Sequence, residues 1–365
     1  VMPEANSQRG ERASARVGAG AQGSAPRTAD TDIAHADGWA TAERFGIHRL
    51  AIPTPFAVGR VNVLLIDDEP LTLVDTGPNS GTSLNALERG LAALGRRIED
   101  IKLVLVTHQH IDHTGLVRIV AERSGAEVAA LDATVPFIER YREEAEAEDA
   151  FAHAMMLRHG IPSDVATALQ SVSRSFRGWG ASGPVHRVLR DGDIVELAQR
   201  RLRVLHRPGH SLSDTVFLDE QRGVAILGDH LLAHISSNPL LARPREGERE
   251  RPRVLVRYLE SLSRTRELDF ALGLPGHGET IADHRALIDE RFALHQRRAE
   301  KIRRLIAQQP RTAYEIAQEL WGNVAVTQAY LTLSEVLGHL DLLLAEGRAR
   351  EIEADGIVRF EAAET

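Results

Sequence analysis

The sequence predicts an α/β fold, in which short buried strands alternate with amphipathic helices. Runs of apolar residues at 61–66, 103–106 and 224–227 have the length of a buried strand, and turn-forming or polar residues bound them. Between the first two runs, residues 83–94 carry leucines at helical spacing: Leu84, Leu87, Leu91 and Leu94. Alternating strands and helices are typical of sheets that are covered by helices.

Length and composition agree with this class. The chain has 365 residues, of which 43% are hydrophobic and 26% charged, so it can bury a large core and a second, smaller one. A net charge of −8 argues against a surface that coats nucleic acid. Without cysteine, disulfides and thiolate ligands are excluded. No apolar run reaches the roughly 18 residues of a membrane span, so we expect a cytoplasmic protein.

The N-terminal part divides into a tail and the first strands. Residues 1–40 are rich in Arg, Ala, Gly and Ser without apolar periodicity, which predicts a disordered tail. A domain over residues 41–295 follows. The runs at 61–66 and 71–74 flank the turn residues 67–70, and this pattern predicts a β-hairpin before the helix at 83–94.

The most informative segment follows the strand at 103–106. It places four side chains that can bind a metal within six residues: His108, His110, Asp112 and His113. Imidazole and carboxylate groups suit zinc, iron or manganese. A strand that ends in such a cluster predicts a metal site.

Three later segments repeat the arrangement of an apolar run that ends in a turn with one ligand. The turns present His210, Asp229 and His277, and a glycine lies next to each or one residue away. Glycine lets the backbone approach a metal closely and adopt conformations that other residues avoid.

Residues 107–113, together with His210, Asp229, His277 and the earlier motif at 73–77, resemble the five-part signature of the metallo-β-lactamase-fold hydrolases. The resemblance spans about residues 45–285 and implies a four-layer αββα sandwich. It implies that His108, His110 and His210 hold one metal ion, that Asp112, His113 and His277 hold the other, and that Asp229 bridges them. It also places Asp75 behind the ligands, where it orients them.

Differences from several subgroups of the family narrow the range of activities that we expect. The β-lactamases of this fold lack a bridging carboxylate at the position of Asp229, and some use a cysteine ligand, so we do not expect antibiotic hydrolysis. Flavodiiron proteins replace the second histidine of the cluster with an acidic residue, whereas this chain has His110. Sulfur dioxygenases of the fold keep the cluster and load a single iron, so that alternative stays open.

The ligand set predicts the chemistry. Two divalent ions, zinc first and manganese or iron as alternatives, lower the pKa of a shared solvent molecule and supply hydroxide near pH 7. Asp112 is expected to orient the hydroxide or accept its proton. We therefore expect hydrolysis of an ester or thioester of a small substrate. The alternatives are a single-strand endoribonuclease or phosphodiesterase, a mononuclear iron sulfur dioxygenase, and a metal-binding scaffold without turnover.

A helical insertion at about residues 135–180 is predicted to cap the metal edge. Residues 165, 169, 172 and 176 fall on one face of a helix, and Met155 and Met156 give a second apolar face that could line the substrate site. The alternative is a helix pair that only packs on the core. Residues 234–239 are a second candidate wall, and residues 243–253 are predicted to form a solvated loop.

Residues 296–365 predict a small C-terminal domain. Helices are expected at 296–308, 312–320 and 333–346, followed by strands at 350–353 and 357–360. This order resembles the winged-helix domain behind some metallo-β-lactamase-fold hydrolases, among them an endoribonuclease acting on single-stranded RNA. The helix at 333–346 has no Lys or Arg, although a nucleic-acid-reading helix usually has several. We therefore favour a role in packing or in a homodimer over nucleic-acid binding.

Overall fold

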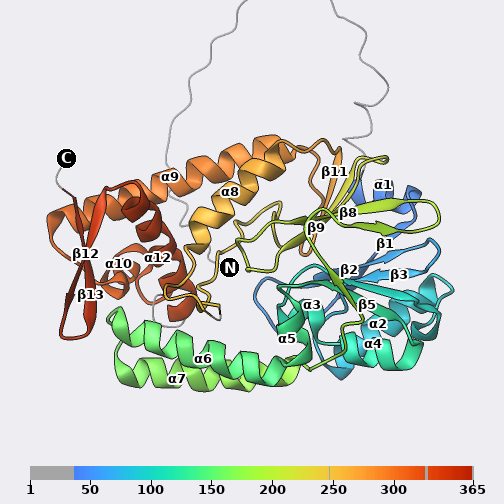
Figure 1. The fold of residues 1–365 in the computed structure, drawn as a ribbon, viewed down its shortest axis with the longest axis horizontal. Helices are drawn as coiled ribbons and strands as arrows, with labels where there is room; N and C mark the ends of the chain where they lie inside the picture. The colour runs from blue at the N-terminus through green and yellow to red at the C-terminus, as the bar shows by residue number, and fades with distance from the viewer. Residues whose placement is uncertain (1–36, 246, 325–327, 364–365) are drawn as a thin grey trace, which may run out of the picture.

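A computed structural model describes residues 37–245, 247–324 and 328–363 (Figure 1). The predicted N-terminal tail lies outside these residues up to position 36. Its last residues, 38–40, already belong to helix α1 (Gly38–Arg44), whose first turn is capped by the side chain of Asp37. The helical segment therefore begins before the predicted boundary at residue 40.

The first sheet has the strand order β1-β2-β3-β4-β5-β6. Its strands are β1 (Ile47–Ile52), β2 (Val61–Ile66), β3 (Thr72–Val74), β4 (Leu103–Val106), β5 (Glu127–Leu131) and β6 (Arg187–Leu189). The predicted hairpin is confirmed, because β2 pairs with β3 antiparallel in a register that sets Leu64 opposite Val74. From β3 to β6 all neighbours are parallel, so the ends of β3 and β4 reach the same edge of the sheet.

The second sheet has the order β11-β10-β9-β8-β7. It contains β7 (Ile194–Glu196), β8 (Arg201–His206), β9 (Thr215–Asp219), β10 (Val224–Gly228) and β11 (Leu272–Pro275). The pair β10 and β11 is parallel, and the other neighbours are antiparallel. The three predicted strands before His210, Asp229 and His277 are therefore β8, β10 and β11.

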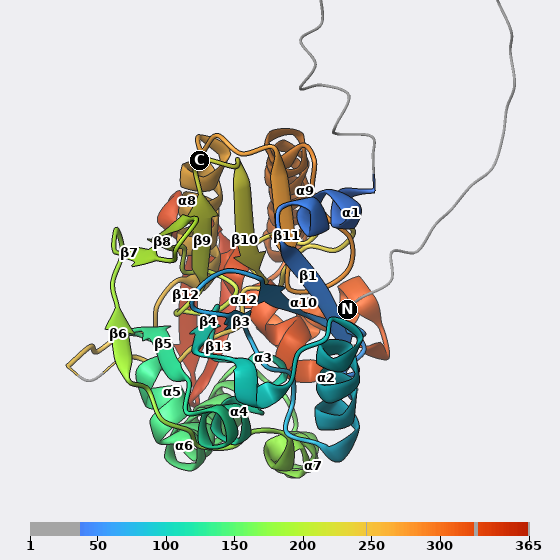
Figure 2. The same cartoon turned by 90° about the vertical axis from the view of Figure 1, so that its right-hand side faces the viewer.

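The two sheets pack face to face between two layers of helices, as Figure 2 shows. Side chains alternate along β2: Leu64 and Ile66 enter the core between the sheets, whereas Val63 and Leu65 face the helical layer. Helices α2 (Gly81–Ala93) and α4 (Val117–Ser124) cover the first sheet, and α8 (Val254–Arg266) and α9 (His284–Gln308) cover the second. The predicted αββα sandwich is confirmed.

The helical insertion is present, and part of its apolar surface packs on the C-terminal elements. It consists of α5 (Val135–Glu139), α6 (Tyr141–Arg158), α7 (Ser163–Phe176) and a 3-10 helix, η3 (Arg177–Trp179). Met155 and Met156 are buried in a cluster that the insertion shares with the C-terminal elements. The prediction that they line the substrate site is wrong, because both side chains are buried against the C-terminal helices.

The predicted apolar face of α7 is only partly buried. Val165 and Leu169 pack on the same cluster, while Val172 is 52% exposed. Phe176, at the end of the helix, lies against Phe56 with ring centroids 5.6 Å apart. The insertion therefore connects the sandwich with the C-terminal elements, as α6 and α7 do along the lower edge of Figure 1.

The C-terminal elements follow the predicted order of helices and strands. They are the second half of α9, then α10 (Ala313–Trp321), α12 (Ala329–Ala345), β12 (Ala349–Ala354) and β13 (Ile357–Ala362). A capping box between Thr312 and Glu315 starts α10. Gly347, with φ of 68°, follows the end of α12. The helix α9 is continuous from His284, so it crosses the predicted domain boundary at residue 295.

The predicted loop at 243–253 lies between β10 and α8 and has no helix or strand in its described part, where residues 245, 247–250 and 253 are exposed as expected. Two of its arginines nevertheless contact other elements. Arg243 pairs with Glu144 and Glu148 of α6, and Arg251 binds Asp341 of α12 through two hydrogen bonds of 2.6 and 2.7 Å.

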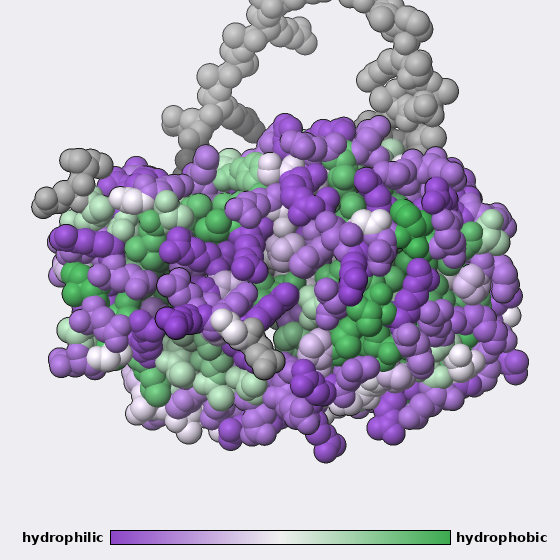
Figure 3. All heavy atoms as spheres, viewed as in Figure 1, coloured by the Kyte–Doolittle hydropathy of each residue, from purple (hydrophilic) through white to green (hydrophobic). Residues whose placement is uncertain are grey.

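The outer surface is mostly polar. On the face in Figure 3 hydrophilic residues predominate, with hydrophobic residues gathered right of centre over the first sheet. The large hydrophobic side chains that the described residues expose are scattered: Leu94, Val172, Val188 and Ile352. In the described parts of the chain, no helix has the length and apolar character needed to cross a membrane.

Candidate metal centre

Four strand ends deliver the predicted ligands to one edge of the sandwich. His108 and His110 follow β4, and Asp112 and His113 lie in the short helix α3 (Ile111–Thr114) directly after them. His210, Asp229 and His277 follow β8, β10 and β11. A bridge between Val61 and His277 joins the two sheets at this edge. The structure therefore brings all seven predicted residues together.

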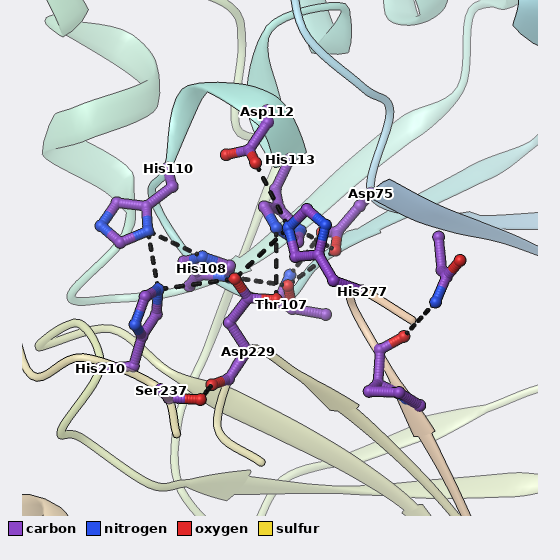
Figure 4. Close-up of polar contacts among 12 residues, drawn as sticks. Asp75, Thr107, His108, His110, Asp112, His113, His210, Asp229, Ser237 and His277 are labelled. Carbon is purple, nitrogen blue, oxygen red and sulfur yellow. Dashed lines mark hydrogen bonds and ion pairs between the residues drawn. The ribbon is translucent and has the colours of Figure 1, made fainter. Parts of the chain in front are cut away.

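Three histidines converge on one side of the site (Figure 4). The Nδ1 atom of His110 lies 3.1 Å from Nε2 of His108 and 2.9 Å from Nε2 of His210. Three ring nitrogens at such separations can share one cation, because metal–nitrogen bonds of about 2 Å bring ligand atoms this close.

Asp112, His113 and His277 form the other side. Nε2 of His277 lies 3.3 Å from Oδ2 of Asp112. Asp229 stands between the two sides, as Figure 4 shows: its Oδ1 is 3.6 Å from Nε2 of His113, and its Oδ2 is 3.5 Å from Nε2 of His277 and 3.6 Å from Nε2 of His210. A carboxylate in this place reaches both groups of ligands.

The far ring nitrogens of three ligands are held by acceptors. Nδ1 of His113 is 2.7 Å from Oδ2 of Asp75, and Nδ1 of His277 and of His210 lie 2.8 and 3.1 Å from the carbonyl oxygens of Arg60 and Asn238. A carbonyl oxygen only accepts, so Nδ1 of His277 and His210 carries the hydrogen and Nε2 presents its lone pair to the site. The position of Asp75 behind the ligands agrees with the sequence analysis.

Asp75 also fixes the end of β4. Its carboxylate accepts hydrogen bonds from the backbone N–H and the hydroxyl of Thr107, at 2.8 and 2.7 Å. Its backbone has φ of 60°, a conformation that is uncommon outside glycine. This geometry lets one carboxylate orient both His113 and the loop that carries His108 and His110.

Glycine is required where the backbone passes closest to the ligands. A Cβ atom on Gly276 would lie 2.3 Å from Oδ1 of Asp229 and 2.8 Å from Cε1 of His113. A Cβ on Gly228, whose φ is 51°, would meet the side chain of Thr107 at 2.8 Å. Both glycines therefore permit the close approach that the sequence analysis expected.

Burial and mutual contacts set the charges in the site. Burial, together with the neighbouring histidines, holds the pKa of His108 well below its usual value and lowers the pKa of His110 to about 3. Burial would raise the pKa of Asp229, but His277 and His113 hold it well below the usual carboxyl value. Burial opposes the charged form of His113, yet Asp75 and Asp229 raise its pKa. His108 and His110 are therefore neutral and Asp229 is ionised, whereas the neighbouring carboxylates favour the charged form of His113.

These residues fit a divalent metal centre. Nε2 of His113, Nε2 of His277 and Oδ1 of Asp229 are buried without a hydrogen-bond partner among the described residues. Ligand atoms of three overlapping triplets also lie within 4.8 Å of one another: His108–His110–His210, His108–His113–Asp229 and Asp112–His113–His277. Buried polar atoms without partners are costly, and a cation would satisfy them.

A fourth triplet with similar spacing lies elsewhere, in His295, Glu335 and His339. Arg298 already pairs with Glu335, and Nδ1 of His295 is 3.1 Å from Nε2 of His339. A divalent ion there would add positive charge beside a guanidinium that the carboxylate already neutralises. This triplet fits a hydrogen-bonded pair of neutral histidines better than a metal site.

Residues close to Asp229 in the sequence differ in whether they contact the site. His230, which adjoins Asp229, points away from it: its Nε2 lies 2.8 Å from the hydroxyl of Thr265 on α8. The candidate wall at 234–239 does contact ligands, since Ser237 donates a hydrogen bond to the carbonyl oxygen of Asp229 and Asn238 accepts one from His210.

Asp214 also supports the site, although no role was predicted for it from the sequence. Its buried carboxylate accepts hydrogen bonds from the backbone N–H and the hydroxyl of Ser211, the residue after the ligand His210. Burial raises its pKa to about 6. The polar run Ser211, Ser213 and Asp214 directly after a ligand was the available signal, because a buried turn needs such side-chain acceptors.

Comparisons with known proteins match both parts of the chain. The sequence profile of the metallo-beta-lactamase superfamily matches residues 57–277, and that of a metallo-beta-lactamase-like C-terminal domain matches residues 299–363. The chain is 36% identical over 297 residues to the probable metallo-hydrolase YqjP of Bacillus subtilis (strain 168), a match that covers 81% of this chain and 92% of that protein.

A solved structure and a more distant relative extend the comparison. The crystal structure of a metallo-beta-lactamase family protein from Thermus thermophilus matches with a TM-score of 0.75 and 32% identity, over 87% of this chain and 99% of that one. An atrochrysone carboxyl ACP thioesterase of Aspergillus fumigatus is 24% identical over 67% of this chain and 59% of its own length. The chain therefore belongs to the metallo-β-lactamase superfamily and is a metal-dependent hydrolase.

Proposed function

We propose that this hydrolase cleaves a thioester or ester of a small acyl substrate with two divalent metal ions. The observation that carries the proposal is the convergence of seven side chains, with three buried polar atoms left without partners, at one edge of the sandwich. His108, His110 and His210 would hold one ion, Asp112, His113 and His277 the other, and Asp229 would contact both. Zinc is the first candidate, with manganese and iron as alternatives.

Bound ions of this kind supply a water nucleophile near neutral pH and polarise a carbonyl oxygen. The protein's own contribution is to orient the reactants. Burial would raise the pKa of Asp112, but His113 and His277 lower it, so the carboxylate is ionised at neutral pH. An ionised carboxylate here can accept a hydrogen bond from a nucleophilic water and take its proton. Asp75 and the carbonyl of Asn238 would keep their histidines in one orientation throughout.

A thioester is preferred as substrate because a relative over 67% of this chain is named an acyl carrier protein thioesterase. This chain spans 59% of that relative's length. We therefore carry over only the chemical class of the relative's substrate, a thioester. Small substrates also suit the polar, acidic surface.

Nucleic acid is the less favoured substrate. Helix α12, which takes the place of a recognition helix in the winged-helix comparison, is largely buried: its Glu335 and Asp341 are 6% and 3% exposed and pair with Arg298 and Arg251. A helix that reads nucleic acid needs an exposed, basic face.

The test is metal analysis with parallel assays on the purified full chain. We expect about two zinc or manganese ions per chain and turnover of a thioester such as an acyl-coenzyme A, and loss of turnover in Asp112→Asn. His153→Gln, a substitution on α6, is the matched control and should keep both properties. Cleavage of single-stranded RNA without thioester turnover would replace the proposal with the ribonuclease. One iron per chain with oxygen uptake would replace it with the dioxygenase.

A further inference from the structure

The metal ligand His210 is supported from behind by a segment without helix or strand. Its Nδ1–H donates to the carbonyl oxygen of Asn238 at 3.1 Å, and the backbone N–H of Leu240 donates back to the carbonyl oxygen of His210 at 3.3 Å. The equivalent acceptor for His277 is the carbonyl of Arg60, directly before strand β2. The support of His277 therefore adjoins a sheet, whereas that of His210 depends on what holds residues 231–245.

Two helices from the last third of the chain hold that segment. From α12, the carbonyl of Leu331 accepts a hydrogen bond from Nδ2 of Asn238 at 3.1 Å, and the hydroxyl of Tyr330 donates to the carbonyl of Leu241 at 2.7 Å. The hydroxyl of Ser334 accepts from the backbone N–H of Leu241 at 3.3 Å. A segment without regular structure needs such partners for its buried backbone groups.

Helix α9 holds the earlier part of the segment. One nitrogen of Arg291, Nη2, lies 3.2, 3.1 and 3.3 Å from the carbonyl oxygens of Leu232, Ala233 and Ile235. The segment is thus fixed between Asp229 and Leu241 by side chains that come from outside the two sheets.

Helix α12 is itself firmly docked. Nδ1 of His339 donates to the carbonyl of Glu335 at 2.7 Å, which leaves Nε2 free to accept a hydrogen bond from His295 of α9 at 3.1 Å. Gly338 packs so closely on Leu255 of α8 that an added Cβ would lie 3.0 Å from the Cβ of Leu255. Since α8 covers the second sheet, α12 has a defined position relative to the strands that carry His210 and Asp229.

We propose that Asn238 is a positioning residue through which helix α12 fixes the metal ligand His210. Its side chain binds α12 while its own carbonyl binds the ligand, so one residue links the C-terminal elements to the metal centre. The C-terminal elements then contribute to metal affinity on the His108, His110 and His210 side, in addition to packing. This inference rests on the proposed function, because it takes His210 to be a metal ligand.

The alternative is that Asn238 only stabilises the fold. Both roles predict that replacing it lowers the melting temperature of the metal-free protein. Only the positioning role predicts that one of the two ions binds more weakly, because only then does the side chain act on the orientation of His210. Metal affinity is therefore the readout that separates them.

The experiment measures zinc binding to the metal-free full chain by competition with a chromophoric chelator, in wild type, Asn238→Leu and Arg158→Ala. Leucine keeps the size of the side chain and removes its hydrogen bond. Arg158→Ala is the control, because it removes the exposed ion pair of α6 with Glu353 of β12 and leaves residues 231–245 untouched. We expect Asn238→Leu to weaken one of the two ions by about 10- to 100-fold, as for other residues that support a metal ligand. Arg158→Ala should stay within about twofold, as expected for an exposed ion pair.

Wild-type affinity for both ions in Asn238→Leu would overturn the inference, even with a lowered melting temperature. A wild-type chain that binds no metal at all would instead overturn the proposed function. If Asn238→Leu does not fold, Asn238→Ser carries the same expectation and the same contrary outcome. Serine removes the contact with Leu331, because its side chain is shorter.

Discussion

The molecule contains two regions with buried histidines, and they differ in how charge is balanced. At the metal edge, Asp112 and Asp229 lie among five histidines, and no Lys or Arg forms an ion pair with either carboxylate in the described parts of the chain. At the junction of α9 and α12, Glu335 lies beside His295 and His339 and is paired with Arg298. The same residue types occur in both places, but only the first leaves negative charge for a cation.

The two regions differ less in how their histidine rings are held than in how charge is balanced. In both regions a histidine donates from Nδ1 to a backbone carbonyl, as His210 does to Asn238 and His339 does to Glu335. Orientation of a ring is therefore a weak sign of a metal ligand. Uncompensated carboxylates and several unpartnered ligand atoms are the stronger sign.

The largest effect is expected from removing the bridging carboxylate. Asp229→Ala should lose most bound metal and lower turnover by more than the roughly 100-fold that loss of a ligand-supporting residue costs, because it takes a ligand from both sides. Metal content and thioester turnover of the purified variant measure this. Glu335→Gln is the matched control at the junction and should retain its metal. Equal metal loss in both variants would remove the distinction between the two regions.

A substitution of Met155 tests whether this part of the insertion packs on the C-terminal elements or lines the substrate site. Met155→Ala should destabilise the protein by about 2–5 kcal/mol, because it opens a cavity in the cluster shared with the C-terminal elements. KM for the substrate should stay unchanged, since the side chain is buried in that cluster. Urea unfolding and steady-state kinetics give the two values. A large change in KM with little change in stability would instead indicate that Met155 lines the substrate site.

Acid should affect the contact between α6 and the C-terminal elements through His159. Burial, with Arg251 and Arg158, lowers the pKa of His159 to about 3, and the ring stacks on Phe360 at 5.9 Å. Because the folded pKa lies below the unfolded one, the contribution of neutral His159 is complete above pH 6.5 and is lost as the pH falls towards 3. The loss at pH 5 should be about 2 kcal/mol.

The measurement is the free energy of unfolding at pH 7.5 and pH 5, for wild type and His159→Phe. Phenylalanine keeps the stacking on Phe360 and cannot titrate, so the variant should lose less stability on acidification than wild type. Equal losses in the two proteins would mean that His159 is accessible to protons in the folded state.

The smallest effect is expected from removing the hydrogen bond between His295 and His339. His295→Leu should leave metal content unchanged and lower stability by about 1–3 kcal/mol, because Nε2 of His339 loses its donor. Elemental analysis and urea unfolding test both parts. A loss of one ion per chain would show that the junction binds metal after all.

The candidate metal centre was predictable because each predicted ligand follows a strand in sequence. His108, His110, Asp112 and His113 come directly after β4, and single ligands follow β8, β10 and β11, so the local pattern already places them at strand ends. Asp75 was located by its family motif. Asp214 and Asn238 were not assigned such roles, because polar residues in a turn are ordinary until a buried partner is known.

The helical insertion shows the opposite case. The periodicity of α6 and α7 predicted helices with apolar faces, and both helices exist. It did not show which surface those faces cover, and Met155 and Met156 pack on the C-terminal helices instead of the metal edge. Burial of apolar area is non-directional, so a sequence pattern indicates that a face is covered and leaves its partner open.

The sequence by itself determined the order of strands and helices, the candidate ligand residues and the glycines beside them, because strand period, turn chemistry and ligand type are local properties. Only the tertiary structure decided that α9 runs unbroken from the sandwich into the C-terminal elements, that Arg298 neutralises Glu335, and that Asn238 joins α12 to His210. Each of these depends on residues far apart in the chain. Their approach is set by the packing of whole elements, which no local pattern specifies.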